Sequence, residues 1–125
     1  APAQGAIMVI ARGEDSRTLA SCEPLNDPDT ALCTKIERDF LRTLLGGCST
    51  PISALAEVED GDLYFRGQLL SLDGRQKAEI ERILPLERAD GLGRSAAEEL
   101  LDSGGQAIAD SLRATGPAVT KTPQA

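Results

Sequence analysis

The sequence contains no histidine and no C-x-x-C pair of cysteines. Histidine-based catalytic triads and most zinc sites need one or the other, so both kinds of site are disfavoured. No run of about 18 apolar residues is present, which argues against a membrane-spanning helix. The chain begins without the basic and apolar stretches of a secretory signal, and this favours a cytosolic protein.

Positive charge is also scarce. The 125 residues include 13 Lys and Arg against 20 Asp and Glu, which gives a formal net charge of −7. Nucleic acids and anionic membrane surfaces require concentrated basic side chains, so neither is expected as a partner. A polyanionic ligand would need cations that this chain does not offer in one dense cluster.

The composition, with 41% hydrophobic and 26% charged residues, is typical of one soluble domain with a single core. Residues 5–11 are almost entirely apolar and predict a strand buried on both faces. No second run of this kind follows, so the strand has no neighbour of its own kind within the chain. Residues 16–26 are predicted to be a linker with at most a short helical turn.

A helix is predicted over residues 28–45. Asp27 is a capping residue, and Pro28 suits the first helical position. Apolar side chains then recur at helical spacing until Gly46 and Gly47 end the pattern.

Three strands connected by hairpin turns are predicted next, over residues 52–59, 63–71 and 76–84. The Asp-Gly pairs that begin at Asp60 and Asp73 supply the turns. These two aspartates are therefore interpreted as turn formers and not as acid or base candidates. Because apolar and polar side chains alternate, one face of the sheet is expected to be exposed to solvent and the other to be covered.

The cover is expected to come from the helix before the sheet and from a helical pattern between Gly93 and Leu112, with a break or kink at Gly104-Gly105. The expected fold class is α+β, with a three-stranded antiparallel sheet covered on one face by helices and preceded by a single orphan strand. The expected divisions are residues 1–15 for that strand, 16–26 for the linker, 27–115 for the domain and 116–125 for a disordered tail.

The most specific motif lies between Ile36 and Ala54, where the chain reads Ile-Glu-Arg-Asp-Phe-Leu-Arg-Thr-Leu-Leu-Gly-Gly-Cys-Ser-Thr-Pro-Ile-Ser-Ala. This is similar to the signature around the cofactor cysteine of the porphobilinogen deaminases (hydroxymethylbilane synthases), in which Leu-x-Gly-Gly-Cys is followed, two residues later, by Pro-Ile-x-Ala. The segment Gln4-Gly5-Ala6-Ile7, followed by Arg12, resembles the strand by which that family returns to its first catalytic domain.

The resemblance implies that Cys48 carries a covalent dipyrromethane cofactor. Gly46 and Gly47 would leave room for a pyrrole ring, and Gln4 and Gly5 are further candidate cofactor-binding residues. Members of the family polymerise four porphobilinogen units to hydroxymethylbilane with release of ammonia, in tetrapyrrole and heme biosynthesis. A soft sulfur nucleophile can capture the electrophile formed by loss of ammonia as a stable thioether.

The position of Cys48 after the C-terminus of the predicted helix disfavours a thiolate, so Cys48 fits an anchor that is loaded once. It fits a redox or protease cysteine poorly, and no resolving thiol lies near it in sequence. Cys22 and Cys33 are interpreted as reduced, partly buried small side chains. For Gly5 and Arg12 the structural alternatives are close packing and a solvated strand end.

The resemblance further implies that the catalytic aspartate and the substrate-binding arginines lie in two preceding domains, which this sequence does not include. The chain is then expected to be the C-terminal piece of a larger cytosolic transferase, with no catalytic residue or metal site of its own. By itself it is expected to be inactive, with a free Cys48 thiol and no cofactor.

The expected partners are the two preceding domains, with self-association of the orphan strand as another outcome. The alternative function is a free-standing binding or interaction module with a structural Gly-Gly-Cys turn.

Overall fold

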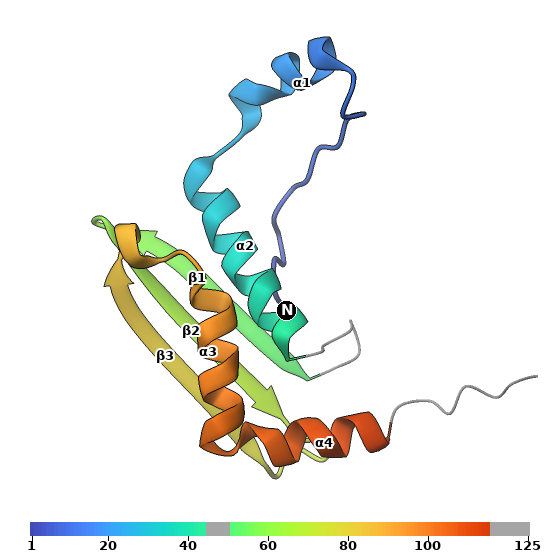
Figure 1. Cartoon of the computed structure of the whole chain (residues 1–125), viewed down its shortest axis with the longest axis vertical. Coiled ribbons are helices and arrows are strands. Elements are labelled where there is room, and N and C mark those ends of the chain that lie inside the picture. Colours follow the sequence, from blue (N-terminus) through green and yellow to red (C-terminus); the bar gives the residue numbers. More distant parts are fainter. Residues whose placement is uncertain (45–50, 116–125) are drawn as a thin grey trace, which may run out of the picture.

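The computed structural model of the chain describes residues 1–44 and 51–115. The longer elements follow in the order α1 (Ser16–Cys22), α2 (Pro28–Thr43), β1 (Ile52–Glu59), β2 (Asp62–Leu70), β3 (Lys77–Pro85), α3 (Leu92–Leu100) and α4 (Gln106–Ala114). Helices α2 and α3 lie side by side across one face of the sheet (Figure 1). This is the α+β architecture that the sequence predicts.

The sheet is an antiparallel meander in the order β1-β2-β3. Its first hairpin turn places Asp60 at φ 52° and Gly61 at φ 81°, the left-handed pair that a two-residue turn between twisted strands requires. In β1, Ile52, Ala54 and Ala56 are buried while the residues between them are exposed. The predicted strands, turns and covered face are therefore confirmed.

The core lies between the sheet and the helices. Phe40 of α2 is fully buried, and its ring meets the ring of Phe65 on β2 edge to face, with centroids 5.2 Å apart. Ile36 of α2, Leu69 of β2 and Leu100 of α3 belong to the same core. The sheet therefore gains its stability from burial under α2 and α3.

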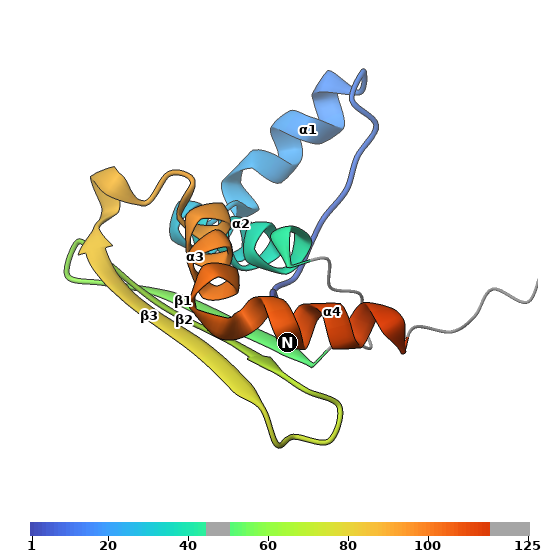
Figure 2. The same cartoon turned by 60° about the horizontal axis from the view of Figure 1, so that its bottom comes forward.

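The helical pattern after Gly93 is broken where the sequence predicts it. Ser103 and Gly104 leave helical geometry, and Gly104 takes φ 116°, which a glycine adopts without strain. Figure 2 shows α4 leaving α3 at a marked angle beyond this break. Ile108 and Ala109 of α4 are nevertheless buried, so the kink keeps α4 in contact with the core.

The N-terminal part differs from the sequence prediction. Residues 6–11 form no strand in this structure, and Ile7 and Ile10 are 94% and 84% exposed. A strand needs neighbours for its backbone N–H and C=O groups, and within residues 1–44 and 51–115 no segment pairs with this one.

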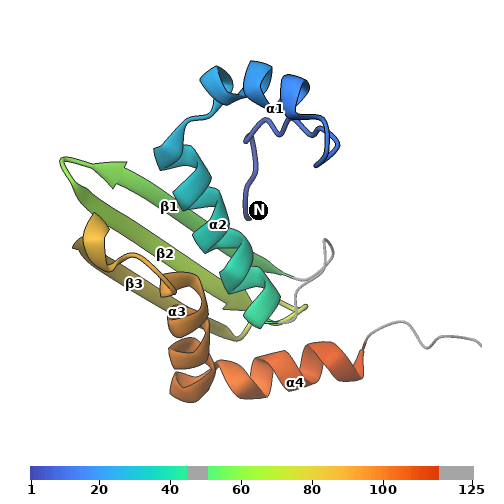
Figure 3. The same ribbon diagram turned by 45° about the horizontal axis from the view of Figure 1, so that its top comes forward.

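The expected linker holds more helix than a single turn. Helix α1 has seven residues, because Asp15 accepts hydrogen bonds from the Thr18 N–H at 3.0 Å and the Thr18 hydroxyl at 2.7 Å. It buries none of its side chains and stands away from the sheet (Figure 3). The predicted tail, residues 116–125, lies outside the described residues.

Candidate cofactor-attachment site

Helix α2, which leads to Cys48, packs closely against the sheet on one side and α3 on another, and a glycine lies at each of these contacts. A Cβ at Gly67 of β2 would lie 2.5 Å from the Phe40 ring, and a Cβ at Gly93 of α3 would overlap the backbone oxygen of Ile36. Real Cβ atoms essentially never approach closer than 3.0 Å. The sheet and α3 therefore approach α2 at distances that only glycine permits.

Both ends of the segment that contains Cys48 are anchored. Leu44, at the end of α2, is buried and donates its N–H to the Phe40 oxygen at 3.1 Å. Pro51, before β1, accepts the N–H of Leu70 through its backbone oxygen at 3.0 Å. The predicted site residues Gly46, Gly47 and Cys48 lie in the sequence between Leu44 and Pro51. They are outside the described residues.

The charges near the end of α2 are mostly engaged along the helix itself. Asp39 accepts a hydrogen bond from Lys35 at 2.6 Å and lies 3.8 Å from Arg42. Arg42 is the basic residue of the last turn. The expectation that Cys48 is an unactivated thiol stays a prediction from the sequence, because Cys48 lies outside the described residues.

The two other cysteines behave as interpreted from the sequence. Cys33 is buried on α2, and this burial raises the pKa of its thiol, with the negative charge of Glu37 adding to the effect. Cys22 is half-buried on α1. A buried thiol with a raised pKa is a poor nucleophile, so Cys33 is a packing residue.

The two N-terminal candidates have different surroundings. Gln4 is exposed and lies at a cavity of about 490 Å³, where it meets residues of α2 and the first two strands. The cavity is lined by Ala1, Gln4, Glu37, Ser53, Ala54, Leu55, Arg66 and Gln68. Gly5 has φ 82°, and a Cβ there would meet no atom within 4 Å. Glycine therefore suits position 5 because of the positive φ of the backbone and not because of close packing.

Sequence reasoning missed Glu37, the one charged residue that is buried among the described residues, at 6% exposure. Its Oε1 accepts the N–H of Ala56 at 2.8 Å, and its Oε2 accepts the N–H of Ala3 at 2.6 Å. Helical spacing could have found it, because Glu37 follows Cys33 by one turn on the buried face of α2.

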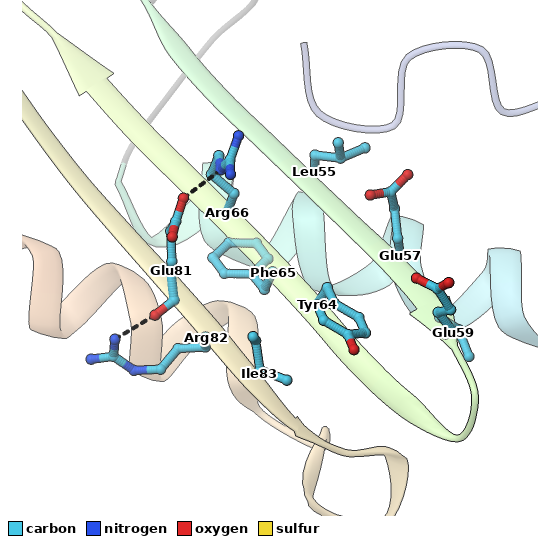
Figure 4. A pocket seen from close by; sticks show the side chains of 10 residues that line it. Leu55, Glu57, Glu59, Tyr64, Phe65, Arg66, Glu81, Arg82 and Ile83 are labelled. Atoms are coloured by element: carbon cyan, nitrogen blue, oxygen red, sulfur yellow. Dashed lines mark hydrogen bonds and ion pairs between the residues drawn. The ribbon is translucent and has the colours of Figure 1, made fainter.

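The face of the sheet opposite the helices carries a second cavity, of about 420 Å³ (Figure 4). Leu55, Tyr64 and Ile83 form its apolar part, beside an ion pair of 2.6 Å between Arg66 and Glu81. Of the predicted site residues that the structure describes, neither Gln4 nor Gly5 lines this cavity.

Two further findings apply to residues 1–44 and 51–115. No group of three or more His, Cys, Asp or Glu side chains there could hold a metal ion. No helix in that part of the chain combines the length and the apolar character that crossing a membrane requires.

The chain is thus a small α+β domain whose clamped helix leads through a Gly-Gly-Cys segment into an open three-stranded sheet. Residues 31–102 match the family described as porphobilinogen deaminase, C-terminal domain. The chain belongs to this family, as the resemblance of the Gly-Gly-Cys motif predicts.

Individual relatives agree with the family match. The porphobilinogen deaminase of Syntrophobacter fumaroxidans is 38% identical over 109 residues, which cover 87% of this chain and 35% of that protein. That of Roseiflexus castenholzii is 42% identical over 105 residues, or 84% of this chain and 34% of that protein. That of Gloeobacter violaceus is 41% identical over 110 residues, which cover 87% of this chain and 34% of that protein. The chain spans 34–35% of the length of these curated relatives.

Proposed function

We propose that this chain is the cofactor-carrying domain of a hydroxymethylbilane synthase, with a dipyrromethane attached to Cys48 through a thioether. The observation that carries the proposal is the family match over residues 31–102, which includes Gly46, Gly47 and Cys48. The complete enzyme would polymerise four porphobilinogen units to hydroxymethylbilane with release of ammonia.

The residues of the chain suit a group that is attached once and kept. A thiol forms a thioether, which lacks the easy reversibility of an ester or an imine. When bound, the dipyrromethane would supply the end to which further pyrrole units are joined. The buried Leu44 and the Pro51 backbone oxygen, which accepts the N–H of Leu70, anchor the chain on either side of the Cys48 segment. Gly46 and Gly47, which precede Cys48 in the sequence, carry no side chains.

We further propose that this chain is part of a larger protein. Its two preceding domains would contribute the catalytic aspartate and the arginines that hold the acetate and propionate groups. The net charge of −7 supports this division, because this chain is poorly suited to hold a polyanion alone. The cytoplasmic location stays a prediction from the sequence.

The exposed apolar run at residues 6–11 supports a partner for the N-terminal part. Ile7 and Ile10 expose almost all of their side chains, and apolar surface of this kind is normally covered in a soluble protein. We propose that a preceding domain covers it as a paired strand, and that in the isolated chain it associates with a second copy or frays. Light scattering that finds a clean monomer, together with slow amide exchange over residues 6–11 of the isolated chain, would contradict this.

The attachment is tested by intact mass spectrometry of the complete protein. We expect a dipyrrole-sized adduct in the parent protein, no adduct after Cys48→Ser, and an unchanged adduct after Cys22→Ser, a matched control on α1. An adduct that survives Cys48→Ser would refute the attachment site. The isolated 125-residue chain is expected to show an unmodified mass and to form no tetrapyrrole from porphobilinogen.

A further inference from the structure

The contacts of Glu37 join three segments that are far apart in the sequence. Its carboxylate lies on α2, and its two oxygens accept N–H groups from Ala3 before α1 and from Ala56 on β1. No ion pair of Glu37 occurs among residues 1–44 and 51–115. Burying a charged group without a partner is costly, so these two hydrogen bonds are what its burial depends on.

The hydrogen bond from Ala56 gives a partner to a backbone N–H at the outer edge of the sheet. Within the part of the chain that the structure describes, strand β1 pairs with β2 alone, so alternate N–H groups on its outer side have no partner in the sheet. The N–H of Ala56 donates to Glu37, and the Ala56 side chain is buried. One oxygen of the carboxylate is thereby fixed to the sheet.

The bond to Ala3 holds a strained backbone. Ala3 has φ 58°, in the left-handed region that a residue with a Cβ seldom adopts. The N–H of Gln4 donates to the Ala1 oxygen at 3.1 Å, and that of Ala6 donates to the Ala3 oxygen at 3.3 Å, so residues 1–6 form a tight turn. Figure 3 shows the N-terminus of the chain beside α2. The second oxygen of Glu37 therefore fixes this turn to the helix.

We propose that Glu37 is a positioning residue, which fastens the N-terminal turn to the helix that leads to Cys48. This inference rests on the proposed function for its consequence in catalysis. The chain arrives from the proposed preceding domains through residues 1–6, whereas the cofactor would be tethered just after α2. One carboxylate thus sets the position of the tether relative to the domains that bind substrate. Fastening Ala3 also brings Gln4 to the cavity at β1 and β2.

The fastening itself is tested by NMR on the 125-residue chain, without cofactor or substrate. In the Glu37→Gln variant the side-chain amide has a single acceptor oxygen, so it can satisfy only one of the two N–H groups. We expect it to stay with Ala56, which the sheet holds in place. The Ala3 amide resonance should then move to a position typical of unstructured chains, and its exchange should become faster by about tenfold or more. Glu57→Gln, at an exposed carboxylate on the opposite face, should leave the Ala3 resonance where it is.

A second pair of variants keeps the inference testable if Glu37→Gln does not fold. Ala3→Pro removes the N–H donor without touching the core, and its ring also excludes the left-handed φ of residue 3. It should therefore release the turn by both effects while the Ala56 amide stays unchanged. Ala3→Gly keeps the donor and suits the left-handed backbone, so it should keep the turn fastened. A turn that stays ordered in Ala3→Pro, or an Ala3 resonance that does not move in a folded Glu37→Gln variant, would overturn the proposal.

The catalytic consequence is measured in the complete protein, per cofactor-loaded molecule. Because substrate binding is assigned to the preceding domains, Glu37→Gln and Ala3→Pro should leave KM nearly unchanged and lower kcat on the order of tenfold or more. A merely structural role would lower the yield of loaded enzyme and not its kcat, and that result would refute the positioning role. If the complete protein carries no cofactor at Cys48, the proposed function fails, whereas the NMR result on the turn stands or falls separately.

Discussion

Replacing Gly93 by alanine sets two physical effects against each other. Gly93 lies in the first turn of α3, where intrinsic helix propensity favours alanine over glycine by at most about 1 kcal/mol. Propensity by itself therefore predicts a more stable protein. The structure predicts the opposite, because the new Cβ would meet α2.

The magnitude follows from the atoms that the Cβ would meet. It would overlap the backbone oxygen of Ile36 and lie 2.9 Å from the Cβ of Asp39 and 3.0 Å from the backbone nitrogen of Phe40. Two of these are backbone atoms inside a helix, so they cannot rotate away, and α3 must move off α2. Overpacking of this kind typically costs about 1–3 kcal/mol, and the rigid neighbours place the cost in the upper part of that range. After the propensity gain, we expect a net loss of about 2 kcal/mol.

The assay is thermal unfolding of the 125-residue chain, followed by far-ultraviolet circular dichroism. A loss of about 2 kcal/mol in a domain of this size corresponds to a fall of about 10 °C in Tm. Gly13→Ala is the matched control, since a Cβ at Gly13 would meet no atom within 4 Å, and it should change the free energy of unfolding by less than about 0.5 kcal/mol. A Tm for Gly93→Ala equal to or above that of the parent chain would refute the close approach of α2 and α3.

Three further predictions concern other positions. Gly61→Ala should cost about 1–2 kcal/mol, measured by urea unfolding, because φ 81° is strained for any residue with a Cβ, and an unchanged midpoint would contradict the turn. The Ser71 hydroxyl, which donates to Asp73 at 2.6 Å, holds the pKa of that carboxyl below its ordinary value. The hydrogen bond to ionised Asp73 therefore stabilises the folded state above the ordinary carboxyl pKa, and this stabilisation is lost as the pH falls through the lowered pKa of Asp73. Ser71→Ala should raise the pKa of Asp73 in an NMR titration, and no rise would argue against the bond. Cys33 should react with a chromogenic disulfide more slowly than Cys22, because burial raises the pKa of the Cys33 thiol, and equal rates in peptide mapping would contradict its burial.

Local patterns in the sequence were sufficient for much of the fold. Asp27 and Pro28 mark the start of α2, alternation marks the three strands, and Asp60-Gly61 marks the first turn. The break at Gly104 was predicted from its glycine pair. These features depend on residues within one turn or one hairpin, whose preferred geometry the residue types set directly. The Gly-Gly-Cys motif likewise identified the family from contiguous residues.

The N-terminal part was predicted less well. The apolar run at residues 6–11 has the composition of a buried strand, yet a strand forms only where another segment offers its backbone. Helix α1 exceeded the single turn expected, because the Asp15 cap stabilises a helix without requiring any burial.

The sequence by itself determined the type and order of the elements, since periodicity and turn chemistry are properties of neighbouring residues. Only the tertiary structure decided that Gly93 is the residue on which the close packing of two helices depends. It also decided that Glu37 binds Ala3 and Ala56. Those contacts join residues distant along the chain, and their distances arise only when the whole core is packed.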